Sequence, residues 1–448
     1  DFSNPADPED RTFEPDPIHY PVVELEYPNT YASERFILLE PKDKDHYNPI
    51  LCLQSTVHTI AEHYLTPQQQ VLFGKLPSKS LSHLWDDDDD VPMTGASSRS
   101  GTPAAEGSAT PDPLLKVLTD AALSSLSTFL PSPSVPSSSK TPLTFNFPRR
   151  LQSAINKRNG PQFLKVMDGV NAFLRMLKYP PLPNDAFKST SPNGLMLNAK
   201  AKSTMPSAII DRIVDETYQR AVGPHVESLK NYAAFSSETY GELMPKFISR
   251  LIKESRLNSD SLFLDLGSGV GNVVCQASLE TGCRSFGIEI LPAPAKVARS
   301  QLEQYQIRCR MWGVQMGEVQ LEESDMLKSK ALDELLPKAD VVLVNNKVFG
   351  TTLNEAIKVK LLDLKEGAVV ISLARFFPKK STVSERNLDD ISSIFQVTDR
   401  EFESGDVSWT GNTDWYYIHK VDRASYADDK KKYESSRSSS TRASRSRK

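Results

Sequence analysis

Hydrophobic and polar positions follow a repeating pattern through the second half of the chain. Short apolar runs typical of strands recur there, with stretches of helical spacing between most of them. The predicted order is helix 243–255, strand 261–266, helix 272–281, strand 284–289, helix 294–305, strand 340–344, helix 352–362, strand 368–373 and strand 415–421. Strands separated by helices predict a parallel, doubly wound sheet, which is the Rossmann-like α/β class.

The first half is organised differently. Apolar clusters predict two strands between 18 and 39, and helical spacing predicts helices at 50–65, 163–177 and 206–221. We expect five regions: a small acidic α/β region at 1–85, a disordered linker at 86–145, a helical subdomain at 146–255, the α/β domain at 256–422 and a basic disordered tail at 423–448.

The linker prediction rests on composition. Five aspartates, Asp86 to Asp90, precede a stretch rich in Ser, Pro, Gly and Thr, with a short helix expected at 113–128. Such a segment cannot bury enough apolar area to offset the entropy of ordering it. Residues 1–17, rich in Pro and Asp, are expected to be disordered for the same reason.

Length and composition narrow the possible classes. The 448 residues exceed one ordinary domain, and the first residue, Asp1, indicates a fragment or a processed form. No run of 18 apolar residues is found, which argues against a membrane span. The four cysteines are scattered without a C-x-x-C pair, so we expect neither a zinc site nor a disulfide framework, and a reducing compartment.

Charge is unevenly distributed. Residues 1–90 hold 18 acidic and 6 basic side chains, a balance of −12, so the remainder carries +8 within the total of −4. A basic second half points to an acidic surface or a nucleic acid as partner.

The candidate chemistry begins at a glycine-rich turn. The apolar run from Leu262 leads to Asp265 and then to Gly267-Ser-Gly-Val-Gly271, and Glu289 ends the next strand 24 positions after Asp265. The carboxyl ends of two parallel strands form a nucleoside pocket in this arrangement. An ionised Glu289 can accept hydrogen bonds from both hydroxyls of a ribose.

The spacing of the glycines selects among nucleoside ligands. The dinucleotide fingerprint is G-x-G-x-x-G, whereas this turn reads G-x-G-x-G, which opposes an NAD-dependent oxidoreductase. The negative charge of Asp265 repels a pyrophosphate but suits a cationic amino-acid tail. S-adenosylmethionine combines adenosine with such a tail, so the turn predicts a methyltransferase.

Three further motifs accompany the turn. They are Phe235-Ser-Ser-Glu-Thr-Tyr-Gly-Glu-Leu243, Val344-Asn-Asn-Lys-Val-Phe-Gly350, and Val407-Ser-Trp-Thr-Gly411 followed by Tyr416-Tyr417. In this order the four motifs resemble those of the disruptor-of-telomeric-silencing family, histone lysine methyltransferases without a SET domain, and the resemblance covers residues 195–422 in a fungal-type form.

The resemblance implies a class I methyltransferase fold and a function. Family members transfer methyl groups from S-adenosylmethionine to lysine 79 of histone H3 in nucleosomes. A nuclear location and a role in chromatin silencing and the DNA-damage response follow for a member. The partners implied are the core surface of histone H3 and nucleosomal DNA, which we expect the basic tail to contact; no membrane and no metal are expected.

The resemblance also assigns cofactor-binding positions. They are Tyr240, Gly241, Glu242, Leu243, Phe263, Leu264, Asp265, Leu266, Gly267, Ser268, Gly269, Val270, Gly271, Asn272, Glu289, Asp325, Met326 and Asn345. It implies that Asp265 binds the amino group of the cofactor and Glu289 its ribose. Asp325 is implied to bind the exocyclic amine of the adenine, and Met326 to pack against the face of the adenine. Asn272 stands where many relatives have glutamine, and Met326 where relatives often have phenylalanine.

The catalytic positions implied are Asn345 beside the methyl donor, with Phe349, Trp409 and Tyr416 as the wall of a lysine channel. A desolvated aromatic wall lowers the pKa of the incoming amine and attracts the methylated ammonium. Lys347 departs from the family, whose relatives carry phenylalanine there, and a cation opposes an entering lysine unless it turns to solvent. We exclude Lys347 from the site.

Two alternative functions remain open. The same fold could methylate another protein or RNA, although V-N-N differs from the D/N-P-P-Y/F strand end of nucleic-acid N-methyltransferases. An inactive chromatin-binding module is the other, which the set Asp265, Glu289 and Asn345 argues against.

Overall fold

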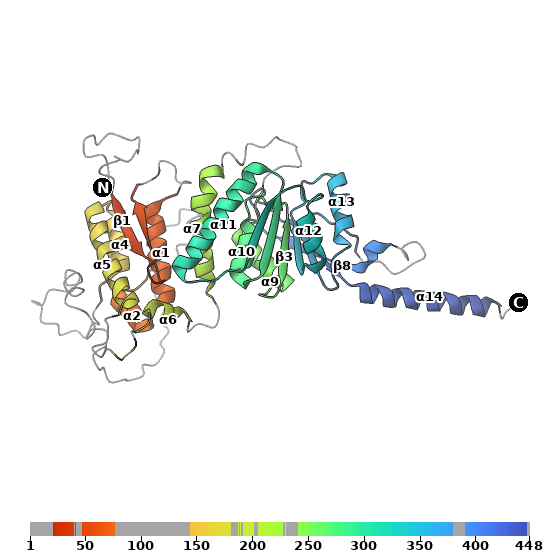
Figure 1. Ribbon diagram of the computed structural model, residues 1–448, viewed down its shortest axis with the longest axis horizontal. Coiled ribbons are helices and arrows are strands. Elements are labelled where there is room, and N and C mark those ends of the chain that lie inside the picture. Colours follow the sequence, from red (N-terminus) through yellow and green to blue (C-terminus); the bar gives the residue numbers. More distant parts are fainter. Residues whose placement is uncertain are drawn as a thin grey trace, which may run out of the picture. The chain divides into compact units, whose positions relative to one another are not determined.

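The computed structural model describes residues 21–39, 41, 47–76, 144–180, 187, 189, 191–200, 205–226, 229, 241–379 and 390–445. These divide into two compact units (Figure 1). Unit 1 comprises the described residues up to Ile209 with Met311–Gly313, and unit 2 comprises Ile210–Arg310 and those from Val314 onward. The disorder expected at 1–17 and the helix expected at 113–128 fall outside the described residues, as does the expected linker 86–145 up to residue 143. Phe145 is buried and stacks on the Phe147 ring at 5.3 Å, so the linker prediction is wrong at its last residues.

Unit 1 combines a β-hairpin with helices. Its elements are β1 (Val22–Glu26), β2 (Ser33–Ile37), α1 (Pro49–Tyr64), α2 (Pro67–Phe73), α4 (Phe147–Asn156), α5 (Gly160–Lys178), α6 (Gly194–Lys200) and the start of α7 (Ser207–Ala221). β1 and β2 pair antiparallel. The two predicted strands and the helices predicted at 50–65 and 163–177 are confirmed as β1, β2, α1 and α5.

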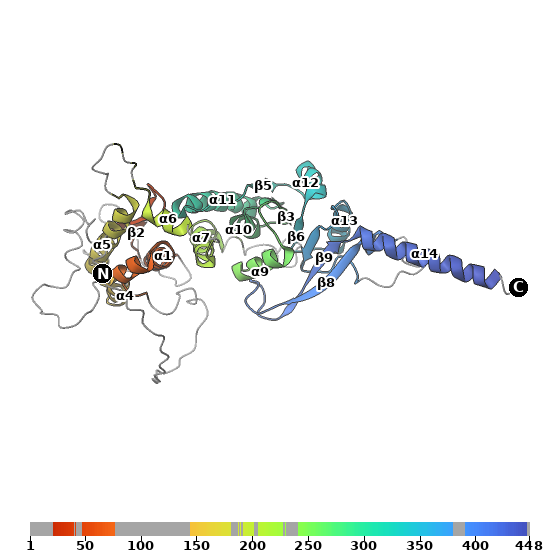
Figure 2. The same cartoon turned by 90° about the horizontal axis from the view of Figure 1, so that it is seen from below.

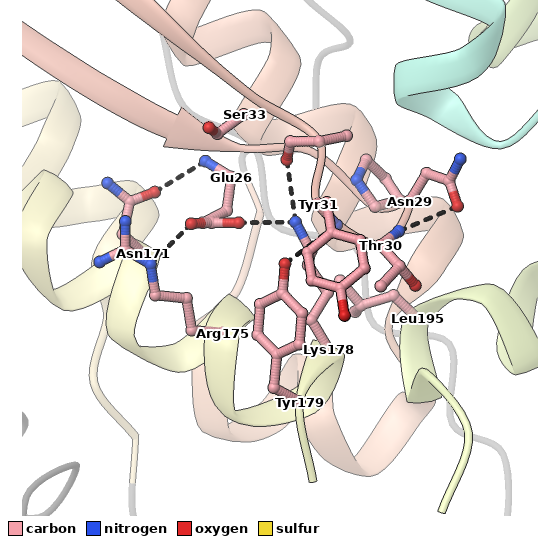
Figure 3. Close-up of polar contacts among 12 residues, drawn as sticks. Glu26, Asn29, Thr30, Tyr31, Ser33, Asn171, Arg175, Lys178, Tyr179 and Leu195 are labelled. Carbon is pink, nitrogen blue, oxygen red and sulfur yellow. Dashed lines mark hydrogen bonds and ion pairs between the residues drawn. The ribbon is translucent and has the colours of Figure 1, made fainter.

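A buried carboxylate joins the hairpin to α5 (Figure 3). Glu26 is 6% exposed and accepts hydrogen bonds from Lys178 Nζ and Arg175 Nε, each at 2.6 Å. Its backbone N–H donates to Asn171 Oδ1 at 2.9 Å. Charges this far from water are tolerated only when they are paired and hydrogen-bonded.

Unit 1 differs from the predicted division at residue 146. The Phe73 ring at the end of α2 lies 5.2 Å from the Phe147 ring and 5.6 Å from the Phe173 ring, so α4 and α5 share a core with the N-terminal helices. The predicted subdomain 146–255 is divided between the units, because the apolar faces of its first helices are buried against the region predicted as 1–85.

Unit 2 is built on one seven-stranded sheet. Its elements are the rest of α7, η2 (Gly223–His225), α9 (Pro245–Ser255), β3 (Leu262–Leu266), α10 (Asn272–Thr281), β4 (Arg284–Glu289), α11 (Pro292–Trp312), β5 (Val319–Glu323), α12 (Lys330–Leu335), η3 (Leu336–Lys338), β6 (Val341–Val344), α13 (Thr351–Leu361), β7 (Val369–Ser372), η4 (Ile391–Ile394), β8 (Phe395–Phe402), β9 (Asp414–Val421) and α14 (Arg423–Arg445).

The sheet order explains where a ligand can bind. The order is β5-β4-β3-β6-β7-β9-β8, with β3 to β7 parallel and β9 antiparallel to both neighbours. The strand order reverses between β3 and β6, and open α/β sheets bind ligands beyond the carboxyl ends of the strands at such a point. The predicted doubly wound α/β fold is therefore confirmed.

Helices cover both faces of the sheet (Figure 1). Leu262, Leu264 and Leu266 of β3 belong to a core cluster that includes Leu332 of α12 and Ile357 of α13. Phe263 belongs to a second cluster with residues of α9. Successive side chains of a strand point to opposite faces, so β3 is buried on both sides.

Several elements differ from the prediction, since α2, α4, α6, α12, β5 and β8 were not predicted and α14 was expected to be disordered. The strands β5 and β8 lie at the two edges of the sheet and are half-exposed, so neither shows a continuous apolar run. The tail expected to lack structure forms α14, which follows β9 directly (Figure 2). Its first turn is capped where Asp422 Oδ1 accepts from Ser425 N at 2.9 Å, and Tyr426 packs against the core.

Other expectations about the chain concern membranes and cysteines. Within the described residues, no helix combines the length and apolar character needed to cross a membrane. All four cysteines are buried and free. The part of the chain that the structure describes contains no group of three or more metal-ligating side chains.

Candidate functional site

The glycine-rich turn joins β3 to α10 at the carboxyl edge of the sheet. Gly267, Gly269 and Gly271 have φ of +87°, +53° and +82°, a left-handed backbone that residues with a Cβ rarely adopt. The N–H groups of Gly267 and Ser268 both donate to Ile288 O at 2.9 Å. The turn is therefore held against β4.

Glu289 closes the other side of this turn. Its Oε2 accepts from Gly269 N and its Oε1 from Leu291 N, both at 2.8 Å. An ionised carboxylate only accepts hydrogen bonds, which suits it to the hydroxyls of a ribose. β3 and β4 pair in parallel register with Leu266 opposite Ile288, which places Asp265 and Glu289 at the same edge.

Asp265 is a buried acid at the centre of the site. It is 2% exposed, and loss of hydration raises the pKa of its carboxyl to about 8, with a further contribution from the charge of Glu289. A positive group placed beside the two carboxylates would offset both effects and favour the ionised form of Asp265.

Two residues predicted for the base of a nucleoside follow β5. Met326 is buried, and its Cε lies 3.9 Å from where a Cβ on Gly267 would stand. Asp325 is more exposed: its Oδ1 accepts from Leu327 N at 2.9 Å, and its carboxylate pairs with Lys328 Nζ at 2.9 Å. The hydrogen bond from Lys328 lowers the pKa of Asp325, so this side chain is an acceptor.

The segment before α9 contacts several parts of the site. Glu242 Oε1 accepts from Tyr218 Oη at 3.1 Å, and Glu242 Oε2 accepts from Asn272 Nδ2 at 2.8 Å. Asn345 Nδ2 donates to Gly241 O at 3.3 Å. Tyr240 lies outside the described residues, so its predicted place stays a prediction.

The S-W-T-G motif is attached to the same segment. Glu242 N donates to Ser408 Oγ and Ser408 N donates to Glu242 O, both at 2.9 Å. Trp409 packs over Gly241, where an added Cβ would stand only 2.6 Å from Trp409 Cε3. Leu243 forms an isolated bridge with Val407 and is buried. Two motifs predicted for one site are thus brought into contact.

The remaining predicted positions of the turn region have structural partners. Phe263, Leu264 and Leu266 are buried in β3, and Val270 is buried against α11 residue Val297. Asn272 Oδ1 accepts from Gln301 Nε2 at 2.9 Å. These residues shape the backbone of the turn.

The predicted aromatic residues occupy different surroundings. Phe349 is half-buried, with its Cζ 3.3 Å from where a Cβ on Gly267 would stand. Tyr416 is 1% exposed, packs edge-on against Phe247 at 5.2 Å, and donates its hydroxyl to Glu254 Oε2 at 2.8 Å. Tyr416 therefore has a packing role in the core, and its assignment to a channel wall stays a prediction.

Lys347 is paired. Its Nζ forms an ion pair with Asp414 Oδ2, and this contact lowers the pKa of Asp414. The exclusion of Lys347 from the predicted site agrees with this geometry.

Sequence reasoning missed several residues that hold the site together. They are Tyr218, Gln301, Asn346, Asn354 and Ser408. Only Asn346 and Ser408 stand inside a recognised motif, and no local sequence pattern connects the other three residues to the site.

The family follows from the sequence of this same region. The sequence model described as "Histone methylation protein DOT1" matches residues 218–421, which hold the glycine-rich turn and each of the motif residues above. Residues 218–421 therefore match the DOT1 family in sequence.

Curated fungal proteins are similar over most of the chain. A protein of Mycosarcoma maydis named "Histone-lysine N-methyltransferase, H3 lysine-79 specific" is 32% identical over 90% of this chain and 60% of its own length. A protein of Cryptococcus neoformans with the same name is 33% identical over 92% of this chain and 64% of its own. The chain thus spans less than two thirds of these relatives. A Yarrowia lipolytica protein of that name is 38% identical over 51% of this chain and 47% of its own length.

Solved structures with a similar fold are methyltransferases. An RNA methyltransferase from Salinibacter ruber in complex with S-adenosyl-L-homocysteine is 19% identical, covering 40% of this chain and 94% of its own, with a TM-score of 0.27. A putative O-methyltransferase from Klebsiella pneumoniae is 15% identical over 50% and 93%, with a TM-score of 0.30. The class I methyltransferase fold is read from the sheet itself, whose parallel strands carry helices on both faces.

Proposed function

We propose that this chain is an S-adenosylmethionine-dependent histone-lysine N-methyltransferase that modifies lysine 79 of histone H3 in nucleosomes. The observation that carries the proposal is the meeting of two motifs at one edge of the sheet. Gly241 and Glu242, beside the glycine-rich turn, contact Trp409 and Ser408 directly. The names of the fungal relatives support the choice of substrate.

The residues at the turn fit the cofactor. Glycines with positive φ leave room where a Cβ on Gly267 would stand against Phe349. Asp265 is a buried acid, and within the part of the chain that the structure describes the charge that acts on its pKa is the negative one of Glu289. The cofactor's ammonium would restore the ionised form of Asp265. Glu289 would accept the ribose hydroxyls, and Asp325 and Met326 would hold the adenine.

The bound cofactor supplies a methyl group on a positively charged sulfur, which a neutral amine can attack in line. Catalysis then requires position and exclusion of water. Asn345, whose amide also holds Gly241 O, would orient the donor end of the site. Trp409 and Phe349 would form the desolvated wall along which the lysine enters, with the buried Tyr416 behind it in the cluster against which Trp409 packs.

The charge of Lys347 does not oppose the incoming lysine in this proposal. Lys347 is paired with Asp414, and two opposite charges in contact exert little electrostatic force on a third charge farther away. The pair therefore repels the substrate lysine only weakly. The amine would lose its proton to water as it is desolvated.

The partners proposed are the core surface of histone H3 and nucleosomal DNA, which implies a nuclear location. Residues 424–448 carry eight basic and three acidic side chains, and α14 presents the first part of this segment as a helix. Basic side chains bind the phosphate backbone without sequence preference.

A methyl-transfer assay tests the proposal. The chain would be incubated with tritiated cofactor and either recombinant nucleosomes or free core histones, with Gly267→Arg as the blank and nucleosomes carrying arginine at position 79 of histone H3 as the substrate control. We expect signal on wild-type nucleosomes only. Signal on free histones alone would refute nucleosome specificity, signal on the arginine-substituted nucleosomes would refute the lysine, and no signal would refute the enzyme.

A further inference from the structure

A chain of side-chain amides lies behind the loop after β6. Asn346 is 1% exposed, and its Oδ1 accepts from Leu373 N at 3.0 Å and Ala374 N at 2.7 Å. Its Nδ2 donates to Ala374 O at 3.1 Å and to Asn354 Oδ1 at 2.9 Å. Both donors and both acceptor positions of the Asn346 amide are therefore used.

Asn354, on the first turns of α13, continues this chain back to the loop. Its Nδ2 donates to Phe349 O at 2.9 Å and to Gly350 O at 3.2 Å. The loop closes on itself where Phe349 N donates to Asn346 O at 3.3 Å. The two amides thus connect the end of β7 to the backbone on both sides of Phe349.

We propose that Asn346 and Asn354 form an amide relay that positions Asn345 and Phe349 for methyl transfer. This inference rests on the proposed function and adds two positioning residues to it. Neither amide is assigned a contact with cofactor or substrate; each acts through the loop that separates them. If the loop moves, the reacting groups lose their alignment and the rate of methyl transfer falls strongly. The affinity for the cofactor is retained, because residues on other strands contribute it.

The hydrogen bonds of the two amides have fixed directions, which apolar side chains filling the same space would not have. An apolar side chain at Asn346 could fill the same volume but would leave two buried N–H groups unpaired. Hydrogen bonds of this kind define one loop conformation, whereas apolar contact tolerates several. Asn354 is only half-buried, and both N–H groups of its amide donate to the loop, so its removal affects the loop more than the core.

The variant that tests the relay is Asn354→Asp in the full chain. The aspartate keeps an acceptor for Asn346 and replaces the donor facing Phe349 O and Gly350 O by an oxygen. We expect kcat on nucleosomes to fall about 10-fold or more, with the Kd for S-adenosylhomocysteine within about 3-fold and the thermal midpoint nearly unchanged. Glu355→Gln, which alters an exposed ion pair with Lys358 on the same helix, is the matched control and should leave kcat unchanged.

A second variant tests whether the two amides act as one unit. Asn346→Asp keeps acceptors for Leu373 N and Ala374 N and loses the donor to Asn354. If the two amides act as one unit, kcat of the double variant should be no more than about 2-fold below that of the weaker single variant, because the effects of coupled residues are not additive. Multiplicative losses in kcat would overturn the relay.

Hydrogen exchange gives a readout that does not need activity. The amides of 347–350 should be protected in the wild type and exchange at least about 10-fold faster in Asn354→Asp. A wild-type kcat in Asn354→Asp, or unchanged exchange, would overturn the inference. If the wild type itself transfers no methyl group, the proposed function fails, and the exchange measurement still decides whether the relay holds the loop.

Discussion

The side chains of Lys347 and Asp414 form an ion pair that connects the loop after β6 to the first residue of β9. β7 lies between these two strands in the sheet, so the pair crosses above its carboxyl end. Lys347 was the one position of the V-N-N loop at odds with a lysine-binding channel. Its charge is neutralised by a residue 67 positions away, five residues after Trp409.

Breaking this pair should affect the substrate more than the fold. Asp414→Asn leaves an uncompensated cation beside the proposed channel, so we expect kcat/KM on nucleosomes to fall about 5-fold or more. The free energy of unfolding should change by less than about 1 kcal/mol, because half-exposed ion pairs contribute little. Steady-state kinetics and urea unfolding measure the two effects.

The matched variant is Lys347→Ala in the Asp414→Asn background, which should restore most of the lost kcat/KM. The Asp414 pKa is lowered in the folded state, so the pair persists above the unfolded pKa of about 4 and is lost as the pH falls through the folded value. An unrestored double variant would show that Lys347 does not act through its charge.

Asp265 should couple cofactor binding to a proton. Its pKa of about 8 exceeds the unfolded value, so the folded chain favours the protonated acid, and ionisation costs stability progressively as the pH rises from about 4 to 8. A bound ammonium would ionise Asp265, releasing about 0.9 proton at pH 7. Calorimetry of S-adenosylhomocysteine binding in buffers of different ionisation enthalpy measures this number, and Asp265→Asn should abolish it. Equal release from the variant would assign the proton elsewhere.

Gly241 should be intolerant of any side chain. A Cβ there would stand 2.6 Å from Trp409 Cε3, closer than atoms approach, so Gly241→Ala must displace the indole or the segment. We expect kcat to fall about 10-fold or more. Gly411→Ala is the control in the S-W-T-G motif, because its Cβ would meet only Ser404 Oγ at 3.9 Å. Equal activity of both variants would remove Trp409 from the site.

Tyr416 should act through its ring rather than its hydroxyl. Tyr416→Phe removes the hydrogen bond to Glu254, an exposed residue whose carboxylate can bind water instead, so the free energy of unfolding should fall by about 1 kcal/mol or less. Because the hydroxyl is bonded to Glu254, which is not a residue of the proposed channel, we expect kcat within about 3-fold of the wild type when the variant is assayed fully folded. A larger loss in kcat at unchanged stability would give the hydroxyl a catalytic role.

The basic C-terminal segment should determine how strongly salt affects nucleosome binding. Truncation after Asp429 removes all eight basic side chains of residues 424–448, and we expect the slope of log affinity against log salt to become shallower. Fluorescence anisotropy with labelled nucleosomes at several salt concentrations measures the slope. Unchanged affinity and slope would rule out α14 as a DNA contact.

Much of unit 2 was determined by the sequence alone. Fully buried strands such as β3 are short apolar runs, and a left-handed turn requires glycine, so the strand, the turn and α10 could be located without the structure. The position of Asp265 and Glu289 at the same edge of the sheet also followed, because adjacent parallel strands end at the same edge. The half-exposed edge strand β5 carried no such signal and was missed.

The tertiary structure alone decided what surrounds that turn. The contacts of Ser408 with Glu242 and of Lys347 with Asp414 join residues 166 and 67 positions apart, and no local pattern records such distances. The burial of Tyr416, the union of α4 and α5 with the N-terminal hairpin and the capping of α14 have the same origin. Periodicity reports which face of an element is apolar, whereas the partner of that face is chosen by packing the whole chain.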